Sequence, residues 1–454
     1  MFDELKKLLA RAEADYADIR YEVKRETAIS YSGRELTGLS ASSADGYVLR
    51  VLKDGGLASV AFTRLTDAEQ ALATATANAG IIGRAAKEPV RLAETEVVQD
   101  DVRPELDEDP RKLTVEEKLA LLKKYNDIAL DHEKVATTSL AYSDLIREKH
   151  FLSTEGSRVR EELVTVRISG GIITREGGLT QSVRVGMGGS DGLGSLRGRE
   201  ALVEERKKLA VDLLTAEPIK GGTYRVVLDQ RLAGVFTHEA FGHFSEADLI
   251  EDSPTMRAKM QLGAELGTGV LSIKDDPTVP HQLGHYRYDD EGVRARPTQL
   301  MKDGVLTGRL HSRRTAAALG EPLSGHCIAE DYRYAPIVRM GNIFIEPGRD
   351  SLEGLLERLG DGLYLCNAMG GQTSGENFTF GAQYGFEVKA GKRAKMLRDI
   401  NISGNLYSTL KSITGIADDL TLGEVGGCGK GQTNVRSCYG APHVLVENVV
   451  IGGR

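Results

Sequence analysis

The 454-residue sequence has no tryptophan and few cysteines, namely Cys327, Cys366, Cys428 and Cys438. Four cysteines in so long a chain cannot form a disulfide framework, so we expect thiols in a reducing compartment. No stretch approaches the ~20 consecutive apolar residues of a membrane-spanning helix. The chain has 58 lysines and arginines and 66 acidic residues, which give a net charge of −8. This composition predicts no overall positive charge with which to bind the phosphate backbone of a nucleic acid. We therefore expect no membrane insertion and no direct contact with nucleic acid.

The N-terminus also lacks the features of a secretory signal. The first residues, MFDELKKLLARAEAD, mix acids and bases within a helical apolar pattern and contain no uninterrupted apolar core. They predict an amphipathic helix, and we expect a cytoplasmic protein.

What the sequence does contain indicates an ordinary globular protein of two domains. Hydrophobic residues make up 41% and charged residues 27% of the chain. Because single cores stop growing near ~250–300 residues, this length favours two domains. Glycine is abundant at 52 residues, which suits tight turns between short strands. The composition predicts a turn-rich α+β fold.

The order helix, β-meander, helix is predicted twice in the first half of the chain. Helical spacing and strand alternation place the first set at residues 2–14, 18–63 and 66–80, and the second set at 115–131, 136–188 and 198–215. Residues 85–114, rich in acids and proline, predict a surface connector. The repeated order predicts an internal duplication, without a residue-level repeat to accompany it.

A change of composition at residues 218–222 predicts the domain boundary. Beyond it glycines become denser and strands shorter. We therefore expect an N-terminal helix–meander–helix domain over residues 1–217 and a strand-rich, glycine-rich C-terminal domain over residues 218–454.

The residues that carry chemistry lie in the C-terminal half. A predicted strand at 223–228 is followed by Asp229, a suitable N-cap, and by a predicted helix over 230–248 that contains HEAFGH. Its pattern is His238-Glu239-x-x-x-His243. In the familiar zinc-protease pattern two histidines four residues apart bind zinc from one helical face, and the glutamate acts as base.

The five-residue spacing of these histidines requires a distorted helix. Five residues rotate an ideal α-helix by about 500°, which leaves the two side chains roughly 140° apart. A π-bulge absorbs one extra residue and would bring His238 and His243 onto one face. We expect Gly242 to ease that distortion. The alternative is a regular polar helix face with two hydrogen-bonded histidines.

A catalytic zinc needs a third protein ligand, and the sequence offers two. Glu246 is predicted one helical turn after His243, whereas Cys428 lies far along the chain in GGCGKGQT, between glycines. Spacing alone does not choose between them. His281 and His285 are four apart, but Pro280 and Gly284 argue against a helix there.

Several segments together resemble the TldD/PmbA family, also described as modulators of DNA gyrase. They are HEAFGH, DDEG (289–292), RPTQLMKDGVLTGRLHSRRTAAALG (296–320), PIVRMGNIFIEPG (336–348), GGQTSGENFTFGAQYGFEVKAGK (370–392) and GGCGKGQT (426–433). Each is weak alone, but their order is specific.

The resemblance implies a zinc-dependent peptidase with His238, His243 and Cys428 as ligands and Glu239 as base. Because the partner-type members, called PmbA or TldE, lack this complete set, it places the chain on the TldD side. It further implies a dimer, with a PmbA/TldE-like subunit or a second copy, whose chamber admits unstructured peptides or peptide precursors.

A second hypothesis is a non-catalytic partner or regulatory protein with structural zinc. Structural zinc sites are normally closed by four ligands, and Glu246 would complete such a set here. For an oxyanion stabiliser, His285, Arg294 and Tyr384 are candidates by chemical type only.

Overall fold

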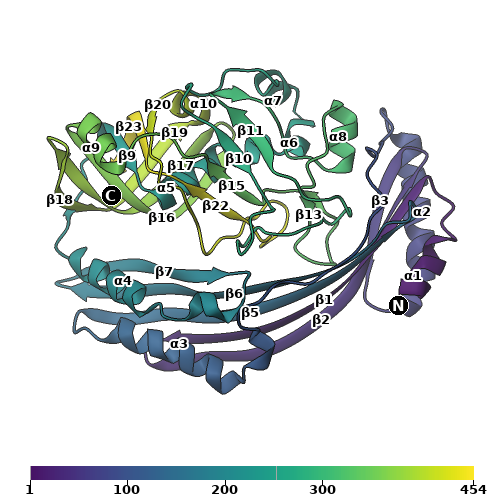
Figure 1. Ribbon diagram of the computed structural model, residues 1–454, viewed down its shortest axis with the longest axis horizontal. Coiled ribbons are helices and arrows are strands. Elements are labelled where there is room, and N and C mark those ends of the chain that lie inside the picture. Colours follow the sequence, from purple (N-terminus) through teal and green to yellow (C-terminus); the bar gives the residue numbers. More distant parts are fainter. Residues whose placement is uncertain (1, 252, 454) are drawn as a thin grey trace.

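The computed structural model describes residues 2–251 and 253–453. A long curved sheet carries helices at its two ends, and a strand-rich C-terminal part lies against one of its faces (Figure 1). This arrangement confirms the predicted α+β class. No helix of the described residues is long and apolar enough to cross a membrane.

The first sheet unites both predicted meanders. Its path is β3-β2-β1-β5-β6-β4, with β7 paired to β6. The strands are β1 (Tyr16–Ser32), β2 (Glu35–Lys53), β3 (Gly56–Phe62), β4 (Gln99–Val102), β5 (Val135–Ser153), β6 (Arg158–Glu176) and β7 (Leu179–Gly189). The antiparallel pairing of β1 with β5 joins the two meanders. The prediction of a connector without strands over 85–114 is therefore wrong at β4. The sequence did not indicate this strand, because QDDV shows no apolar alternation.

Four helices complete this part, and the helix–meander–helix order occurs twice as predicted. They are α1 (Phe2–Leu9), α2 (Ala68–Ala85), α3 (Val115–Leu130) and α4 (Glu200–Asp212). A capping box starts α3, in which Thr114 and Glu117 each bind the other's backbone N–H. Helices α1 and α2 share a core with β1–β3, whereas α3 and α4 share a separate core with β5–β7.

The C-terminal part contains two larger sheets around a common core and a two-stranded sheet. The eight-stranded sheet contains β8 (Glu217–Pro218), β9 (Gly222–Leu228), β16 (Gly362–Ser374), β17 (Asn377–Lys389), β18 (Lys392–Arg398), β19 (Ile400–Asn405), β20 (Ile413–Ile416) and β23 (Val444–Gly453). The six-stranded sheet contains β10 (Ile273–Asp275), β11 (Thr298–Lys302), β12 (Val305–Leu306), β15 (Asn342–Ile345), β21 (Thr421–Leu422) and β22 (Cys438–Ala441). Strands β13 (Cys327–Ile328) and β14 (Ile337–Val338) form the small sheet. The proposed boundary at residue 218 falls in β8, which pairs with β18.

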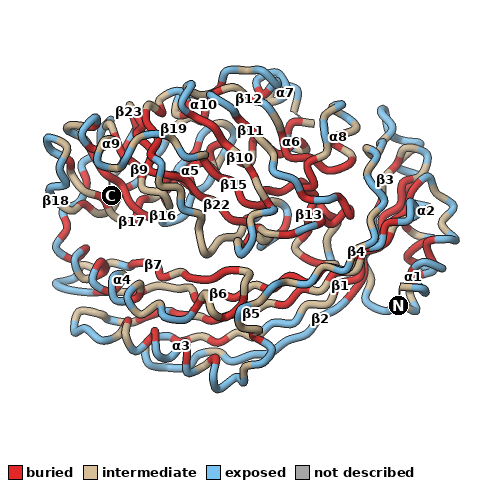
Figure 2. Tube along the Cα trace, viewed as in Figure 1, coloured by how far each residue is buried: buried red, intermediate tan, exposed pale blue. Residues whose placement is uncertain are grey.

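Helices of the C-terminal part are short, and α5 is central among them. They are α5 (Gln230–Thr237), α6 (Ala247–Glu251), α7 (Pro254–Lys259), α8 (Arg313–Leu319), α9 (Leu352–Leu359) and α10 (Leu406–Leu410). Helix α5 contacts β16 of one sheet and β15 and β22 of the other. Buried positions run through these sheets, while the outward sides of α3 and α4 are exposed (Figure 2). The core thus holds the end of α5 in place, where the histidine motif begins.

Candidate metal centre

Helix α5 begins where the sequence predicted. Strand β9 ends at Leu228, and the Asp229 carboxylate accepts a hydrogen bond of 2.8 Å from the backbone N–H of Leu232. This N-cap satisfies one of the free donors at the helix start. The cap and the buried apolar face of α5 fix the direction in which the chain enters the HEAFGH segment.

The predicted distortion of the helix is confirmed. Residues His238–Gly242 form a π-helical turn directly after α5. The extra residue brings the His238 and His243 rings together, with centroids 5.1 Å apart and planes at 81°. Gly242 has ordinary helical dihedrals, and a Cβ there would lie 2.2 Å from the Met340 sulfur. A larger residue at position 242 would therefore displace the Met340 side chain, so close packing favours the glycine.

The helix ends earlier than predicted, which changes the position of Glu246. A 3-10 turn covers His243–Ser245, and Glu246 itself is extended, with φ −80° and ψ 112°. The backbone on either side of Glu246 bonds to Leu310. The prediction that Glu246 follows His243 by one helical turn is therefore wrong. Its buried carboxylate nevertheless reaches Nδ1 of His243, at 3.1 Å.

A hairpin-like loop brings Cys428 to the two histidines. Cys428 and Val435 exchange two backbone hydrogen bonds of 3.1 Å each. The Cys428 Sγ lies 3.0 Å from Nε2 of His238 and 3.4 Å from Nε2 of His243. The three ligand atoms all lie within 4.8 Å of one another. Residues 190 positions apart in the chain thus meet at one point.

The chemistry of this donor set fits zinc. Two imidazole nitrogens and one thiolate are ligand types that zinc accepts. With Zn–N distances of ~2.0–2.1 Å and a Zn–S distance of ~2.3 Å, tetrahedral geometry separates nitrogen from sulfur by roughly 3.6 Å. The His243–Cys428 distance of 3.4 Å is close to that value, and the His238–Cys428 distance of 3.0 Å is shorter than it. Glu246 contacts Nδ1 of His243, whereas Nε2 faces Cys428, so the carboxylate orients this histidine from its other side.

The thiol of Cys428 and the imidazole of His243 compete for a proton, and their surroundings shift both pKa values. Burial raises the pKa of Cys428, but hydrogen bonds with His238 and His243 outweigh it and lower the pKa to about 6. Burial lowers the pKa of His243, but its bonds to Cys428 and Glu246 raise it to about 10. The cluster therefore favours a thiolate beside an imidazolium. A metal cation binding here would displace that proton.

Glu239 lies beside the cluster at the wall of a cavity. Its backbone carbonyl and its Oε2 accept hydrogen bonds from the Thr373 hydroxyl, at 2.8 and 3.3 Å. A Cβ at Gly371 would lie 3.2 Å from the Glu239 Cγ, so the glycine leaves room for this side chain. The cavity measures about 620 Å³, and its lining includes all four predicted site residues, a stretch of β16 and the apolar Phe244, Leu249 and Met256.

Sequence reasoning missed Lys430 as a structural part of this site. Its ammonium donates to Glu246 at 3.0 Å, to Asp248 at 2.8 Å and to the Val338 carbonyl at 2.9 Å. Because Lys430 follows Cys428 by two residues, it ties the cysteine loop to the carboxylate that holds His243. Its place in GGCGKGQT was the available signal.

The remaining histidine pair lies elsewhere. The segment with His281 and His285 is not helical, as Pro280 and Gly284 indicated. Both histidines line a second cavity together with Arg294. Tyr384 lines a third cavity with Asp229.

Comparison with known proteins shows the family. Models of PmbA/TldA metallopeptidase domains match in order: domain 1 over residues 17–79, the central domain over 108–214 and the C-terminal domain over 221–453. The chain belongs to the PmbA/TldD family of metallopeptidases. The resemblance seen in the sequence motifs is thereby confirmed.

Members of this family match the chain along nearly its whole length. A metalloprotease of Synechocystis sp. is 37% identical over 446 residues, which cover 98% of this chain and 96% of that protein. A zinc metalloprotease TldD homolog of Saccharolobus solfataricus is 30% identical over 462 residues, which cover 98% and 99%.

Solved structures share the fold of this PmbA/TldD member. A protein of Thermotoga maritima described as a candidate modulator of a DNA gyrase gives a TM-score of 0.81 at 24% identity, covering all of both chains. TldE of Thermococcus kodakarensis gives 0.76 at 21% identity, covering 99% of this chain and 100% of TldE. At these identities the likeness concerns the fold alone.

Proposed function

We propose that the chain is a zinc-dependent peptidase in which His238, His243 and Cys428 hold the metal and Glu239 is the catalytic base. The observation that carries this proposal is the convergence of the three ligand atoms beside Glu239 in an open cavity. Relatives named metalloprotease and zinc metalloprotease support it. Peptide-bond hydrolysis is the reaction that this donor set and an adjacent carboxylate serve best.

When bound, zinc supplies Lewis acidity that activates water and a substrate carbonyl near neutral pH. Glu239 takes a proton from the attacking water and returns it to the departing amine. Thr373 holds the carboxylate of Glu239 in place through its hydroxyl. The thiolate of Cys428 adds negative charge to the ligand set, which makes the metal a softer and weaker Lewis acid.

The substrate proposed for this site is an extended, unstructured peptide. Strand β16 pairs with β9 only over Leu363–Leu365, and its later residues Gly371–Thr373 line the metal cavity. A peptide could add to this stretch through main-chain hydrogen bonds, which recognise an extended backbone more than its side chains. Such binding selects against folded proteins.

We further propose that the active assembly is a dimer, with a PmbA/TldE-like subunit or with a second copy. A chamber enclosed by two subunits would admit unfolded chains and exclude compact ones. The shared fold with TldE is consistent with related subunits that pair.

The alternative of a closed structural zinc site is disfavoured by the position of Glu246. Its Oε2 bonds Nδ1 of His243 and the ammonium of Lys430. A metal ion between the Nε2 atoms and Cys428 would lie on the opposite side of the His243 ring. Glu246 therefore acts as a partner of that ring in this proposal.

One experiment tests the proposed function directly. Zinc content and cleavage of an unstructured peptide are measured for the wild type and for Glu239→Gln, alone and with a candidate TldE-like subunit. We expect one zinc per chain in both proteins, and cleavage that falls by roughly 10²–10⁴-fold in the variant. A wild type that binds zinc tightly but cleaves nothing, even with the added subunit, would favour the non-catalytic alternative.

A further inference from the structure

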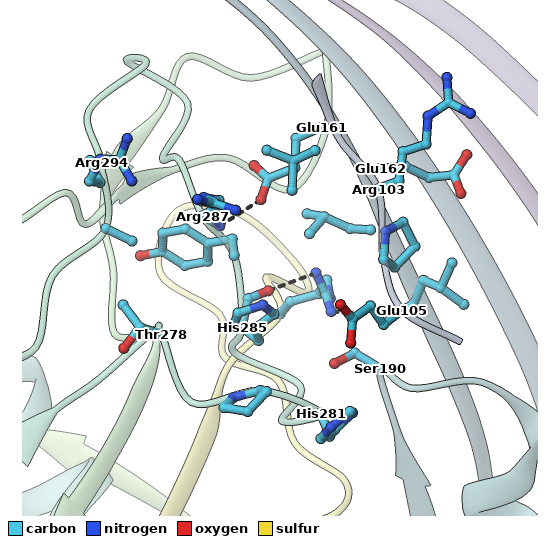
Figure 3. Close-up of a pocket in the computed structure, with 18 residues that line it drawn as sticks. Arg103, Glu105, Glu161, Glu162, Ser190, Thr278, His281, His285, Arg287 and Arg294 are labelled. Atoms are coloured by element: carbon cyan, nitrogen blue, oxygen red, sulfur yellow. Dashed lines mark hydrogen bonds between the residues drawn. The ribbon is translucent and has the colours of Figure 1, made fainter. Parts of the chain in front are cut away.

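A second cavity of about 560 Å³ lies between the first sheet and the C-terminal part (Figure 3). Leu163 and Val164 of β6 line one side, while His285 and Tyr286 come from the loop after Pro280. Arg436 enters from the segment that follows Cys428. The cavity is therefore built by both parts of the chain and lies apart from the metal cavity.

Arg436 lines this cavity without a counter-ion. Its two terminal nitrogens make only long contacts of 3.4 Å, to the backbone carbonyls of His285 and Val164. Its Nε is buried and has no hydrogen-bond partner. Within residues 2–251 and 253–453, no carboxylate oxygen lies within 4.0 Å of this guanidinium, whereas nearby Arg147 forms ion pairs at 2.7 and 3.2 Å.

The missing partner is costly for a largely desolvated charge. Burial and the neighbouring Arg147 lower the pKa of Arg436 to about 10 against a smaller opposing effect of Glu161, so Arg436 still carries its charge at neutral pH. A buried charge that is neither paired nor fully hydrogen-bonded destabilises the protein that contains it. An anion that enters the cavity would supply the close counter-charge that Arg436 lacks.

The other polar groups of the cavity favour a carboxylate over a dianion. Nδ1 of His285 donates to the Pro277 carbonyl at 3.0 Å, and burial lowers the pKa of this histidine, so its neutral ring adds no second positive charge that would attract a dianion. Three glutamates, Glu105, Glu161 and Glu162, line the cavity with three further arginines, Arg103, Arg287 and Arg294, so Arg436 leaves the lining with one excess positive charge. A planar monoanion matches the planar guanidinium fork.

We propose that this cavity binds a carboxylate group, with the Arg436 guanidinium as its principal partner. The carboxylate comes either from an acidic peptide or from a free small carboxylic acid. The alternative of an acidic peptide rests on the proposed function. The chain itself links the two cavities. Arg436 directly follows Val435, whose backbone pairs with Cys428. Acidic residues remote from the scissile bond would then strengthen substrate binding.

Direct binding tests the proposal without requiring turnover. Fluorescence anisotropy compares a labelled acidic peptide with its matched glutamine peptide carrying a C-terminal amide, on the full chain. The proteins are the wild type, Arg436→Met and the control Arg175→Met, which removes an exposed charge from strand β6 outside the cavity lining. For Arg436→Met we expect ~10–100-fold weaker binding of the acidic peptide only, the loss typical of charge-assisted hydrogen bonds. Binding to the control should not change.

Thermal unfolding with butyrate, a monocarboxylate, tests the second source. Butyrate should raise the melting temperature of the wild type and of Arg175→Met, and leave that of Arg436→Met unchanged. If only the butyrate effect depends on Arg436, the site binds free carboxylates; if the acidic peptide also depends on it, the peptide is a ligand. Arg436→Met should melt no lower than the wild type, because it removes an unpaired charge. If it does melt lower, Arg436→Lys, which keeps the charge and loses the fork, replaces it in both assays.

The proposal is overturned if neither acidic peptide nor butyrate distinguishes the wild type from the Arg436 variants. Equal weakening of both peptides would also overturn it, because the loss would not depend on a carboxylate. A chain that cleaves no peptide but binds acidic ones through Arg436 would contradict the proposed function and leave the carboxylate site intact.

Discussion

Charged and ionisable groups are buried in two regions of this chain that are organised differently. Where the C-terminal part covers the first sheet, Asp290 lies 3.2 Å from Arg147, 3.1 Å from Lys149 and 3.6 Å from Arg20. Each of these three cations comes from β1 or β5. At the metal centre, two imidazoles and a thiol, all electron-pair donors, converge on one another.

The two regions differ in whether the charged and ionisable groups complete one another. The first region, here called the ionic interface, contains both the anion Asp290 and its cations, so it supplies its own counter-charges. It lies outside the metal cavity and holds the loop 289–292 on the first sheet. The donors of the metal centre compete for a proton and border a cavity. A self-paired network stabilises a contact, whereas a set of like donors is completed by a ligand.

The largest expected effect comes from the thiol of the metal centre. Cys428→Ser should abolish stoichiometric zinc binding, because a serine hydroxyl remains protonated where the thiol ionises. Outer partners of metal ligands alone contribute ~10–100-fold to affinity, so loss of a ligand should exceed 100-fold. Zinc affinity is measured by competition with a chelating dye.

Cys438 provides the matched control for this prediction. It lies on the adjacent strand β22, its thiol donates to the Gly423 carbonyl at 2.9 Å, and burial raises its pKa to about 12. Cys438→Ser should keep one zinc per chain. Equal zinc loss in both variants would show that the centre collapses with the local fold and would remove the special role of Cys428.

A substitution in the ionic interface should change the free energy of unfolding rather than the affinity for metal. Asp290→Asn leaves Arg20, Arg147 and Lys149 without their shared carboxylate, and should lower the free energy of unfolding by about 3–5 kcal/mol. The exposed pair Lys123–Asp127 is the control, with both side chains 58% exposed. Asp127→Asn should cost less than about 1 kcal/mol in urea unfolding. Equal costs would mean that the buried network adds nothing to the contact between the two parts.

The sequence predicted the helices and strands of the first part well, but it did not indicate which charged residues on the strands are buried. Alternation placed the meanders and the flanking helices, because each strand has one apolar face. The same alternation gives Arg20 and Glu22 the appearance of solvent-facing residues. They are buried, because Arg20 pairs with Asp290 and Glu22 pairs with Arg147, and local periodicity carries no information on contacts between such distant residues.

At the metal centre, geometry within the motif was predictable and distant contacts were not. The five-residue spacing of His238 and His243 required a π-turn, and the structure contains it. Spacing could not choose between Glu246 and Cys428, since loop closure over 190 residues leaves no local signal. The helix end at Ser245 also went unpredicted, because it follows from backbone pairing with Leu310 rather than from a proline or glycine.

A smaller effect should come from the carboxylate behind His243. Glu246→Gln removes the negative charge that holds Nδ1 and should weaken zinc binding by roughly 10–100-fold. Asp248→Asn is its control, since Asp248 shares Lys430 at 2.8 Å and has no bond to His243. Equal weakening in the two variants would assign the effect to Lys430 and the loop it anchors.

The smallest effect is a pH dependence that belongs to the ionic interface alone. Burial opposes ionisation of Asp290, but Arg147, Arg20 and Lys149 outweigh it and hold the pKa well below its usual range. An unfolded aspartate has a pKa of about 3.9, so the unfolded chain binds the proton first as pH falls. The stability from this carboxylate is therefore fully present above that value and is lost below it.

Urea unfolding from pH 7 to pH 3 should show a constant difference in unfolding free energy, here called the gap, between the wild type and Asp290→Asn down to about pH 5. Below about pH 4 the gap should shrink by at most ~1.4 kcal/mol per pH unit, the limit for one proton. A gap that stays constant to pH 3 would mean that the carboxylate gains nothing from its three cations on folding, and the contrast with the metal centre would lose its basis.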